Sequence, residues 1–248
     1  MRKLLPVLMA ATVASAAAAQ TIPNRESARI QNRLAWEHMK VEAWEKAAGM
    51  FRQAISLDPT YEYAYYGLGR ANMAMKKYVE AIAALEKCGS LYRAEAGRRF
   101  ANAQEAQRYR RDRIMEIDDQ IRQVQSMPQS AKSADQLRQL QNLRRLEQDR
   151  IQRGNNMDID ATVPAYVSLS LGSAYFRAGK LGDAEREYKA AIAADAKAGE
   201  AHSNLAVVYL ETGRLSEAEQ AVRAAERAGY KIHPQLKQDI KERARGGA

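Results

Sequence analysis

A period of 34 residues constrains this chain more than any other feature of its sequence. Residues of similar size and polarity recur at this interval in two separate parts of the chain. In the first part the pairs are Leu34 and Leu68, Trp44 and Tyr78, Ala47 and Ala81, Phe51 and Leu85, and Ala54 and Cys88. In the second part they are Leu171 and Leu205, Gly172 and Ala206, Tyr175 and Tyr209, Gly179 and Gly213, and Ala184 and Ala218. A fixed period of this length is typical of stacked structural units, and it predicts two copies in each part.

Each copy has the composition of two antiparallel helices joined by a tight turn. Small residues such as Gly69 and Gly172 stand where two helices would cross closely, and large ones would fill the space between them. Gly179 and Gly213 fall at the turn, a position that favours a residue tolerant of positive φ. The corresponding residues of the first two copies are Glu42 and Lys76, so glycine does not mark those turns.

At these positions the chain resembles the tetratricopeptide repeat family, in which Leu-Gly, Tyr, a turn Gly, Ala, an aromatic residue and a closing Pro recur. The four copies span residues 28–61, 62–95, 165–198 and 199–232. The last two match the family pattern well, whereas the first two lack the turn glycine and only the first keeps its proline, Pro59. The resemblance implies an all-α solenoid, and residues 233–245 then read as a capping helix with Leu236 and Ile240 inward.

An insertion of 69 residues separates the second copy from the third, because Leu68 and Leu171 lie 103 positions apart. Two degenerate repeats would have this length, but the positions that need small residues carry Met115, Arg122, Asp149 and Asn156. We therefore predict a long antiparallel helical hairpin over residues 96–157, with arms of about 30 residues that reach roughly 45 Å.

The first arm of this hairpin is predicted to run without interruption from Ala94 to Ser126 and to break at Met127-Pro128. The second arm is predicted to begin at Ser133, which forms a capping box with Gln136, and to end near Gly154. Apolar residues at alternating three- and four-residue spacing form a coiled-coil-like stripe along each arm. They are Ile114, Ile117, Ile121 and Val124 in the first arm, and Leu137, Leu140, Leu143 and Leu146 in the second.

The net charge of +9 is concentrated in this insertion. Residues 98–153 hold 13 Lys and Arg against 8 Asp and Glu, whereas residues 154–248 balance at 13 and 13. The densest clusters are Arg108, Arg110, Arg111 and Arg113, together with Arg144 and Arg145. They form either a solvated helix face or a basic patch for an acidic protein or an anionic envelope surface. Nucleic acid is not an expected partner, because few aromatic residues interleave with the arginines.

The first residues have the pattern of a bacterial export signal. Arg2 and Lys3 precede an apolar stretch, Leu4–Ala19, that closes with four alanines, which predicts cleavage after Ala19. An uncleaved membrane anchor is the alternative, but this stretch is shorter than the roughly 20 residues that a spanning helix needs. The mature protein is therefore expected in the periplasm or outside the cell.

No group of residues has the spacing of a catalytic or metal site. The three histidines are scattered, a single cysteine excludes an internal disulfide, and no phosphate-binding glycine loop or nucleophile elbow is present. His38 and Cys88 occupy repeat positions that favour packing. We expect no cofactor and no enzymatic activity.

Binding is the expected function, because stacked helix pairs form a concave surface lined by the first helix of each copy. The resemblance assigns this lining to Asn32, Arg33, Trp36, Tyr63, Tyr66, Arg70, Tyr166, Ser173, Phe176, Arg177, Ser203, Asn204 and Val207. Tyr66 and Tyr166 could equally pack against the neighbouring copy. The chain is thus expected to be an adaptor of the bacterial cell envelope that binds a protein or peptide segment. The alternative is a structural protein whose basic hairpin self-associates or attaches to an anionic surface; the sequence leaves the oligomeric state open.

Overall fold

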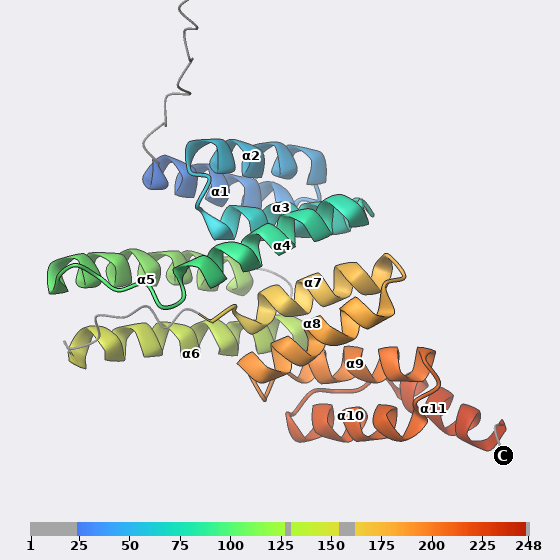
Figure 1. The fold of residues 1–248 in the computed structure, drawn as a ribbon. Helices are drawn as coiled ribbons and strands as arrows, with labels where there is room; N and C mark the ends of the chain where they lie inside the picture. Colours follow the sequence, from blue (N-terminus) through green and yellow to red (C-terminus); the bar gives the residue numbers. More distant parts are fainter. Residues whose placement is uncertain (1–23, 127–129, 154–161, 247–248) are drawn as a thin grey trace, which may run out of the picture.

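The 34-residue period produces a series of antiparallel helix pairs. The computed structural model describes residues 24–126, 130–153 and 162–246, and within these ranges the regular structure is entirely helical. The helices are α1 (Arg25–Lys40), α2 (Trp44–Leu57), α3 (Glu62–Ala74), α4 (Tyr78–Glu95), α5 (Ala103–Gln125), α6 (Ala131–Arg153), α7 (Ala165–Arg177), α8 (Leu181–Ala194), α9 (Gly199–Glu211), α10 (Leu215–Arg227) and α11 (Pro234–Gly246). Four pairs, α1/α2, α3/α4, α7/α8 and α9/α10, correspond to the four copies (Figure 1). The prediction of an all-α solenoid is confirmed.

Small residues allow the two helices of a pair to approach closely. A Cβ atom at Gly69 would lie 2.5 Å from Leu85 Cγ, and one at Gly172 would lie 2.8 Å from the ring of Tyr188. Both distances are far below van der Waals contact, so these positions exclude any side chain at the present spacing of the helices.

The four interhelical turns share one conformation, although only two of them contain glycine. Gly179 and Gly213 have φ angles of 75° and 73°, and Glu42 and Lys76 have φ angles of 57° and 59°. In each turn the following N–H donates to the carbonyl five residues earlier, from Ala43 to His38, Lys77 to Asn72, Lys180 to Tyr175 and Arg214 to Tyr209, at 2.8–2.9 Å. This hydrogen bond is characteristic of a helix that ends with a left-handed residue, and it retains the turn where the sequence provides no glycine.

The second repeat stacks directly on the third, despite the insertion between them. The hydroxyl groups of Tyr92 on α4 and Tyr166 on α7 are 3.2 Å apart, and Tyr175 on α7 donates a hydrogen bond to Glu86 on α4. The four repeats therefore form one continuous array, and α5 and α6 lie beside it (Figure 1).

The first arm of the insertion does not run without interruption, so that prediction is wrong. Helix α4 ends at Glu95, Gly97 follows with a φ of 76°, and α5 begins only at Ala103. The side chain of Asn102 accepts a hydrogen bond from the N–H of Glu105 at 2.9 Å and so caps the new helix. A left-handed glycine and an asparagine cap together end one helix and start another.

The second arm begins three residues earlier than predicted, because its capping box uses a different pair. Ser130 Oγ accepts from the N–H of Ser133 at 3.0 Å, and Ser133 Oγ accepts from the N–H of Ser130 at 2.7 Å. Ser133 therefore receives the cap instead of providing it, and Gln136 lies within the helix. Both arms have 23 residues, which corresponds to roughly 34 Å instead of 45 Å. Met127-Pro128, Gly154 and the predicted export signal lie outside the described residues.

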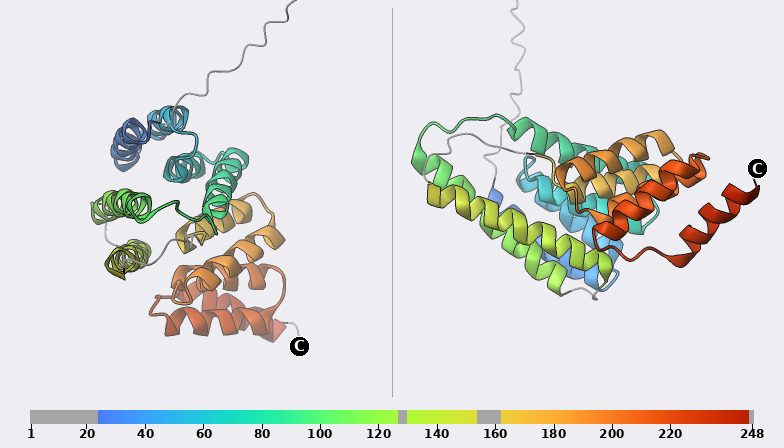
Figure 2. Two further views of the ribbon diagram at one scale, coloured as in Figure 1. Left: turned by 60° about the vertical axis from the view of Figure 1, so that its left-hand side comes forward. Right: turned by 90° about the horizontal axis from the view of Figure 1, so that it is seen from below.

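The predicted apolar stripes are only partly buried. Ile117, Val124 and Leu140 are buried, Ile114, Ile121, Leu137 and Leu143 are half-buried, and Leu146 is exposed. The hairpin, by which we mean α5 and α6, does not project into solvent. It lies within the arc formed by the four helix pairs, on their concave side (Figure 2).

Two further predictions about packing agree with the structure. Cys88 is completely buried, and burial raises the pKa of its thiol well above the usual value. Helix α11 packs on the last repeat with Leu236 and Ile240 buried, while Lys237, Lys241 and Arg243 are exposed.

Candidate functional site

A row of aromatic rings runs along the concave face, which is formed by α1, α3, α7 and α9. Trp36 stacks on Tyr63 with ring centroids 5.7 Å apart, and Tyr63 stacks on Tyr66 at 5.6 Å. Tyr66 then meets Tyr166 edge to face at 5.0 Å. Because all four rings are buried, they join the first three repeats to one another. Tyr66 and Tyr166 therefore pack against neighbouring copies, one of the two roles that the sequence allows.

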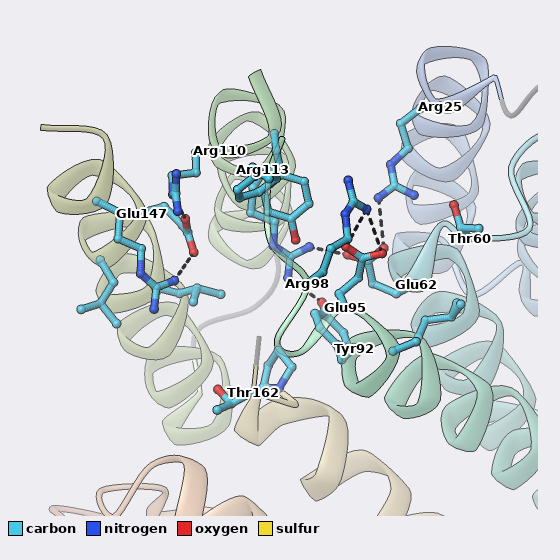
Figure 3. Close-up of a pocket in the computed structure, with 18 residues that line it drawn as sticks. Arg25, Thr60, Glu62, Tyr92, Glu95, Arg98, Arg110, Arg113, Glu147 and Thr162 are labelled. Carbon is cyan, nitrogen blue, oxygen red and sulfur yellow. Dashed lines mark hydrogen bonds and ion pairs between the residues drawn. The ribbon is translucent and has the colours of Figure 1, made fainter. Parts of the chain in front are cut away.

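Helix α5 is held on this face by a network of charges, in which Arg25 also pairs with Asp58 at 3.0 Å. Glu62 on α3 and Glu116 on α5 each accept from two arginines, Arg25 on α1 and Arg113 on α5. The distances from Arg25 are 3.1 Å to Glu62 and 3.0 Å to Glu116, and those from Arg113 are 2.5 Å and 3.2 Å. Figure 3 shows Arg25 and Arg113 directed at Glu62. Two carboxylates and two guanidinium groups thus connect the hairpin to the first two repeats.

Burial and pairing act in opposite directions on this network. Burial raises the pKa of Glu116, while the neighbouring Arg25 and Arg113 favour its charged form. Arg113 also donates to the hydroxyl of Tyr92 at 2.8 Å, and burial raises the pKa of Tyr92 well above its usual value. The network therefore depends on complete pairing of its charges.

Further polar contacts extend along both arms of the hairpin. Arg29 on α1 pairs with Asp119 on α5 at 3.2 Å, and the Tyr63 hydroxyl donates to Gln123 Oε1 at 2.8 Å. On the other arm, Arg138 pairs at 2.9 Å with Asp195, which caps α8.

The N-terminal part of the second arm lies close against the array. Asp135, Gln136 and Gln139 of α6 face Tyr66, Arg70, Tyr166, Leu169 and Glu200 across a space of only about 20 Å³. The hairpin therefore covers one half of the concave face. We call this part the covered half, and it includes Arg25, Arg29, Glu62, Tyr63, Tyr66 and Tyr166.

The other half of the concave face is an open groove. One cavity of about 670 Å³ extends from α1 across α3 to α7, and Ser130, Ser133 and Gln136 of the hairpin border it. A second cavity of about 330 Å³ continues it from α7 to α9, and both cavities share Met73, Ser173 and Arg177. The open groove thus crosses all four repeats.

The walls of the open groove combine apolar side chains with mostly positive charge, since Lys40, Arg70, Lys76 and Arg177 outnumber Glu42 and Glu200. Its apolar residues include Trp36, Met39, Met73, Leu169, Phe176 and Val207. Arg70, Lys76 and Arg177 also line it, and within the described ranges none of these three cations forms an ion pair with a carboxylate. Arg70 donates instead to the Tyr66 hydroxyl at 2.9 Å, and this neighbour raises the pKa of Arg70. Such a surface suits an apolar segment that carries negative charge.

The predicted lining residues do not all line the open groove. Seven of them line the open groove: Trp36, Arg70, Ser173, Phe176, Arg177, Asn204 and Val207. Asn32, Tyr63, Tyr66 and Tyr166 are buried, Arg33 is exposed outside the cavities, and Ser203 is half-buried outside them. Sequence reasoning missed Met39 and Met73, although they are themselves 34 residues apart and each follows a predicted lining residue by three positions.

A third cavity, of about 500 Å³, lies between the hairpin and the end of α4 (Figure 3). Its charged lining residues are Arg25, Arg98, Arg110, Arg113, Arg150, Glu62, Glu95 and Glu147. All of these arginines take part in ion pairs with glutamates, for example Arg98 with Glu95 at 3.0 Å. The charged side chains that line this cavity are therefore mostly paired with one another within the chain.

The predicted basic patch is not one continuous surface. Arg110 and Arg113 are buried, because they point from α5 into this third cavity, and Arg144 pairs with Asp118 at 2.6 Å. Arg108, Arg111 and Arg145 are exposed. This corrects the expectation that all six arginines share one exposed surface.

The described residues show two further features that bear on function. They contain no group of three or more His, Cys, Asp or Glu side chains placed to hold a metal ion. No helix among them combines the length and the apolar character needed to cross a membrane.

Two matches to a known protein family agree with this architecture. Residues 38–96 and residues 169–231 of this chain each match the tetratricopeptide-repeat family. No curated protein sequence matches the chain. Similar solved structures include PilW, a widely conserved type IV pilus biogenesis factor, with 15% identity over 88% of this chain and 86% of that chain and a TM-score of 0.40.

Two other similar structures are repeat proteins by their own descriptions. A thermophilic TPR protein of Thermus thermophilus is 18% identical over 88% of this chain and 98% of that chain, with a TM-score of 0.37. YrrB, a TPR protein with an unusual peptide-binding site, is 18% identical over 88% and 94%, with a TM-score of 0.29. With one repeat match on each side of the hairpin and four helix pairs in a single array, this chain belongs to the tetratricopeptide-repeat family.

Proposed function

We propose that this protein is a non-enzymatic interaction adaptor that binds a polypeptide segment in the open groove. The observation that carries this proposal is the continuity of the groove across α1, α3, α7 and α9, with apolar walls and three unpaired cations among the described residues. Stacked repeats of this kind use such extended concave surfaces for binding. The expected ligand is a segment with apolar side chains and at least one carboxylate.

Photo-crosslinking tests this assignment one residue at a time. A benzophenone amino acid at Phe176, which lines the groove, is expected to capture a polypeptide from an envelope extract. The same amino acid at the exposed Val79 on α4, outside both cavities, serves as the matched control and is expected to capture none. Charge reversal by Arg177→Glu should lower capture at Phe176 by about fivefold, because it removes charge complementarity at the groove.

Charge reversal at a second arginine provides the control for that variant. Arg227→Glu changes an exposed residue of α10 that lines neither cavity, and capture at Phe176 is expected to stay unchanged. Identical products from Phe176 and Val79, or equal capture with both charge reversals, would remove the open groove as the binding site.

We infer that the adaptor acts in the bacterial envelope, on the basis of the predicted export signal at residues 1–19. The two positive residues before the apolar stretch and its closing alanines support this inference. N-terminal sequencing of the protein from a periplasmic or culture fraction should begin at Gln20. A chain that begins at Met1 in those fractions would contradict cleavage.

The structure bears on the alternative function, self-assembly through the hairpin. Ile117, Val124 and Leu140 belong to the apolar core of the same chain, so the central residues of the predicted stripes are already used within the molecule. Attachment to an anionic surface would rest on the exposed Arg108, Arg111 and Arg145. The open groove carries the stronger argument, because it combines a cavity with charge.

A further inference from the structure

The buried surface of α5 differs from that of the repeat helix α7 in its polarity. Eight residues of α5 are buried: Ala106, Arg110, Arg113, Glu116, Ile117, Gln120, Gln123 and Val124. Five of these eight are charged or carry an amide, whereas all nine buried residues of α7 except Ser168 are apolar or aromatic. Polar surfaces of this kind are typical of interfaces that form and separate, because each side chain can be hydrated after separation.

The polar residues of α5 form a single line along the helix. Arg113, Glu116, Gln120 and Gln123 are spaced at i, i+3, i+7 and i+10, so they share one face. Partners on the concave face are known for three of them: Glu62 for Arg113, Arg25 for Glu116 and Tyr63 for Gln123. The concave face thus recognises a helix through the side chains along one of its faces.

Several polar atoms at this interface are buried without a hydrogen-bond partner among the described residues. They are both amide atoms of Gln120 on α5 and Oε1 of Gln139 on α6. A buried polar group that lacks a partner costs free energy, and it recovers that free energy on exposure to water. The unpartnered polar atoms therefore oppose docking of the hairpin, whereas the ion pairs of the same interface stabilise it.

From these observations we infer that the covered half of the concave face is a second protein-binding surface, whose partner is an α-helix that takes the place of the hairpin. The hairpin side chains that contact this surface indicate which side chains a partner helix would present. Arg25 and Arg29 pair with two carboxylates that lie three residues apart on α5, those of Glu116 and Asp119. Tyr63 donates to the amide oxygen of Gln123, four residues further along. The partner helix accordingly presents acidic residues at i and i+3 and an amide at i+7. This inference does not rest on the function proposed for the open groove.

The test uses the full chain and a labelled peptide with the sequence of residues 103–125 as the probe. In the chain, Asp119→Ala/Gln123→Ala/Arg138→Ala weakens the docking of its own hairpin and leaves the concave face unchanged. The peptide is expected to bind this variant roughly tenfold more tightly than the unaltered chain, because the fraction of molecules with a free surface rises. A peptide carrying Glu116→Ala/Asp119→Ala/Gln123→Ala should bind neither chain.

A matched variant controls for the number and place of the substitutions. Gln107→Ala/Arg111→Ala/Arg145→Ala alters three exposed residues of the same two helices and should bind the peptide as weakly as the unaltered chain. Hydrogen exchange is the second measurement: amides of residues 103–153 should exchange faster in the weakened variant, while those of residues 165–227 keep their rates.

Two results would overturn the inference. One is equal peptide affinity for all three chains, and the other is unchanged exchange of residues 103–153 in the weakened variant. If exchange of residues 165–227 also rises, Arg138→Ala alone replaces the triple variant, since its side chain is 42% exposed and its removal spares the core. The peptide must then still bind more tightly than it binds the unaltered chain, or the inference fails.

Discussion

Replacing Arg113 by methionine is expected to lower the free energy of unfolding by about 3 kcal/mol, the lower end of the range for breaking a buried ion pair. The substitution leaves Glu62 and Glu116 in a buried site, where they share Arg25 as counter-ion with Asp58. It also removes the donor to the Tyr92 hydroxyl. Urea unfolding followed by far-UV circular dichroism measures the change.

Arg111→Met is the matched control for this prediction. Arg111 lies two residues earlier on α5 and is exposed, so its replacement should change the free energy of unfolding by no more than about 0.5 kcal/mol. Equal effects of the two substitutions would show that the charge network does not hold the hairpin on the array.

The deficit caused by Arg113→Met should narrow as the pH falls. Burial already raises the pKa of Glu116 in the folded protein, and loss of Arg113 raises it further. Between the unfolded and folded pKa values the folded state binds more protons, so the free energy of unfolding rises as pH decreases through this window. The Arg111→Met variant should differ from the unaltered chain by the same small amount at every pH. A deficit in Arg113→Met that is independent of pH would contradict the role of Glu116.

Gly67→Ala is expected to destabilise the protein by about 1–3 kcal/mol, the usual cost of overpacking a core. A Cβ atom at Gly67 would lie 2.2 Å from Phe51 Cε1 and 2.4 Å from Cζ, and Phe51 is completely buried. Because the surrounding core is close-packed, the ring has no free space into which it can move. Thermal unfolding measures the expected decrease in Tm.

Gly49→Ala provides a control of opposite sign. Gly49 lies inside α2, and a Cβ atom there would meet no other atom within 4 Å. This substitution should stabilise the protein by roughly 0.5–1 kcal/mol, because alanine favours the helix interior. The double variant Gly67→Ala/Phe51→Leu should lose less stability than the two single changes added together, since a smaller side chain makes room for the methyl group. If the stability losses of the two single variants simply add in the double variant, the contact between a Cβ atom at Gly67 and the ring of Phe51 is not the cause of the destabilisation.

The repeat array was predictable because its signal is periodic. Small residues such as Gly69 and Gly172 and the turn residues Gly179 and Gly213 lie where the 34-residue spacing places them. The turns at Glu42 and Lys76 have a left-handed conformation that these residue types do not favour, and the hydrogen bonds from Ala43 to His38 and from Lys77 to Asn72 retain it. Local sequence alone does not reveal this conformation.

The position of the hairpin was not predictable in the same way. Its contacts with the array, such as Arg25 with Glu116 and Arg138 with Asp195, join residues that are 91 and 57 positions apart and follow no period. Arginines on a helix surface have the same sequence signature whether they face water or a buried carboxylate, so Arg110 and Arg113 were assigned to an exposed patch. The division of the concave face into two halves follows from those contacts, and it became visible only in the structure.

The contact between Tyr92 and Tyr166 has a consequence for how the chain folds. Within each half of the array, a repeat meets residues about 34 positions away, whereas these two tyrosines are 74 positions apart. Closing that larger loop costs conformational entropy before any contact repays it. We therefore expect each pair of repeats to form first from local contacts, and the union of α4 with α7 to follow and complete the array. Before α4 and α7 meet, the apolar end of each pair of repeats is exposed to solvent. We expect the chain to be most prone to aggregation at that stage.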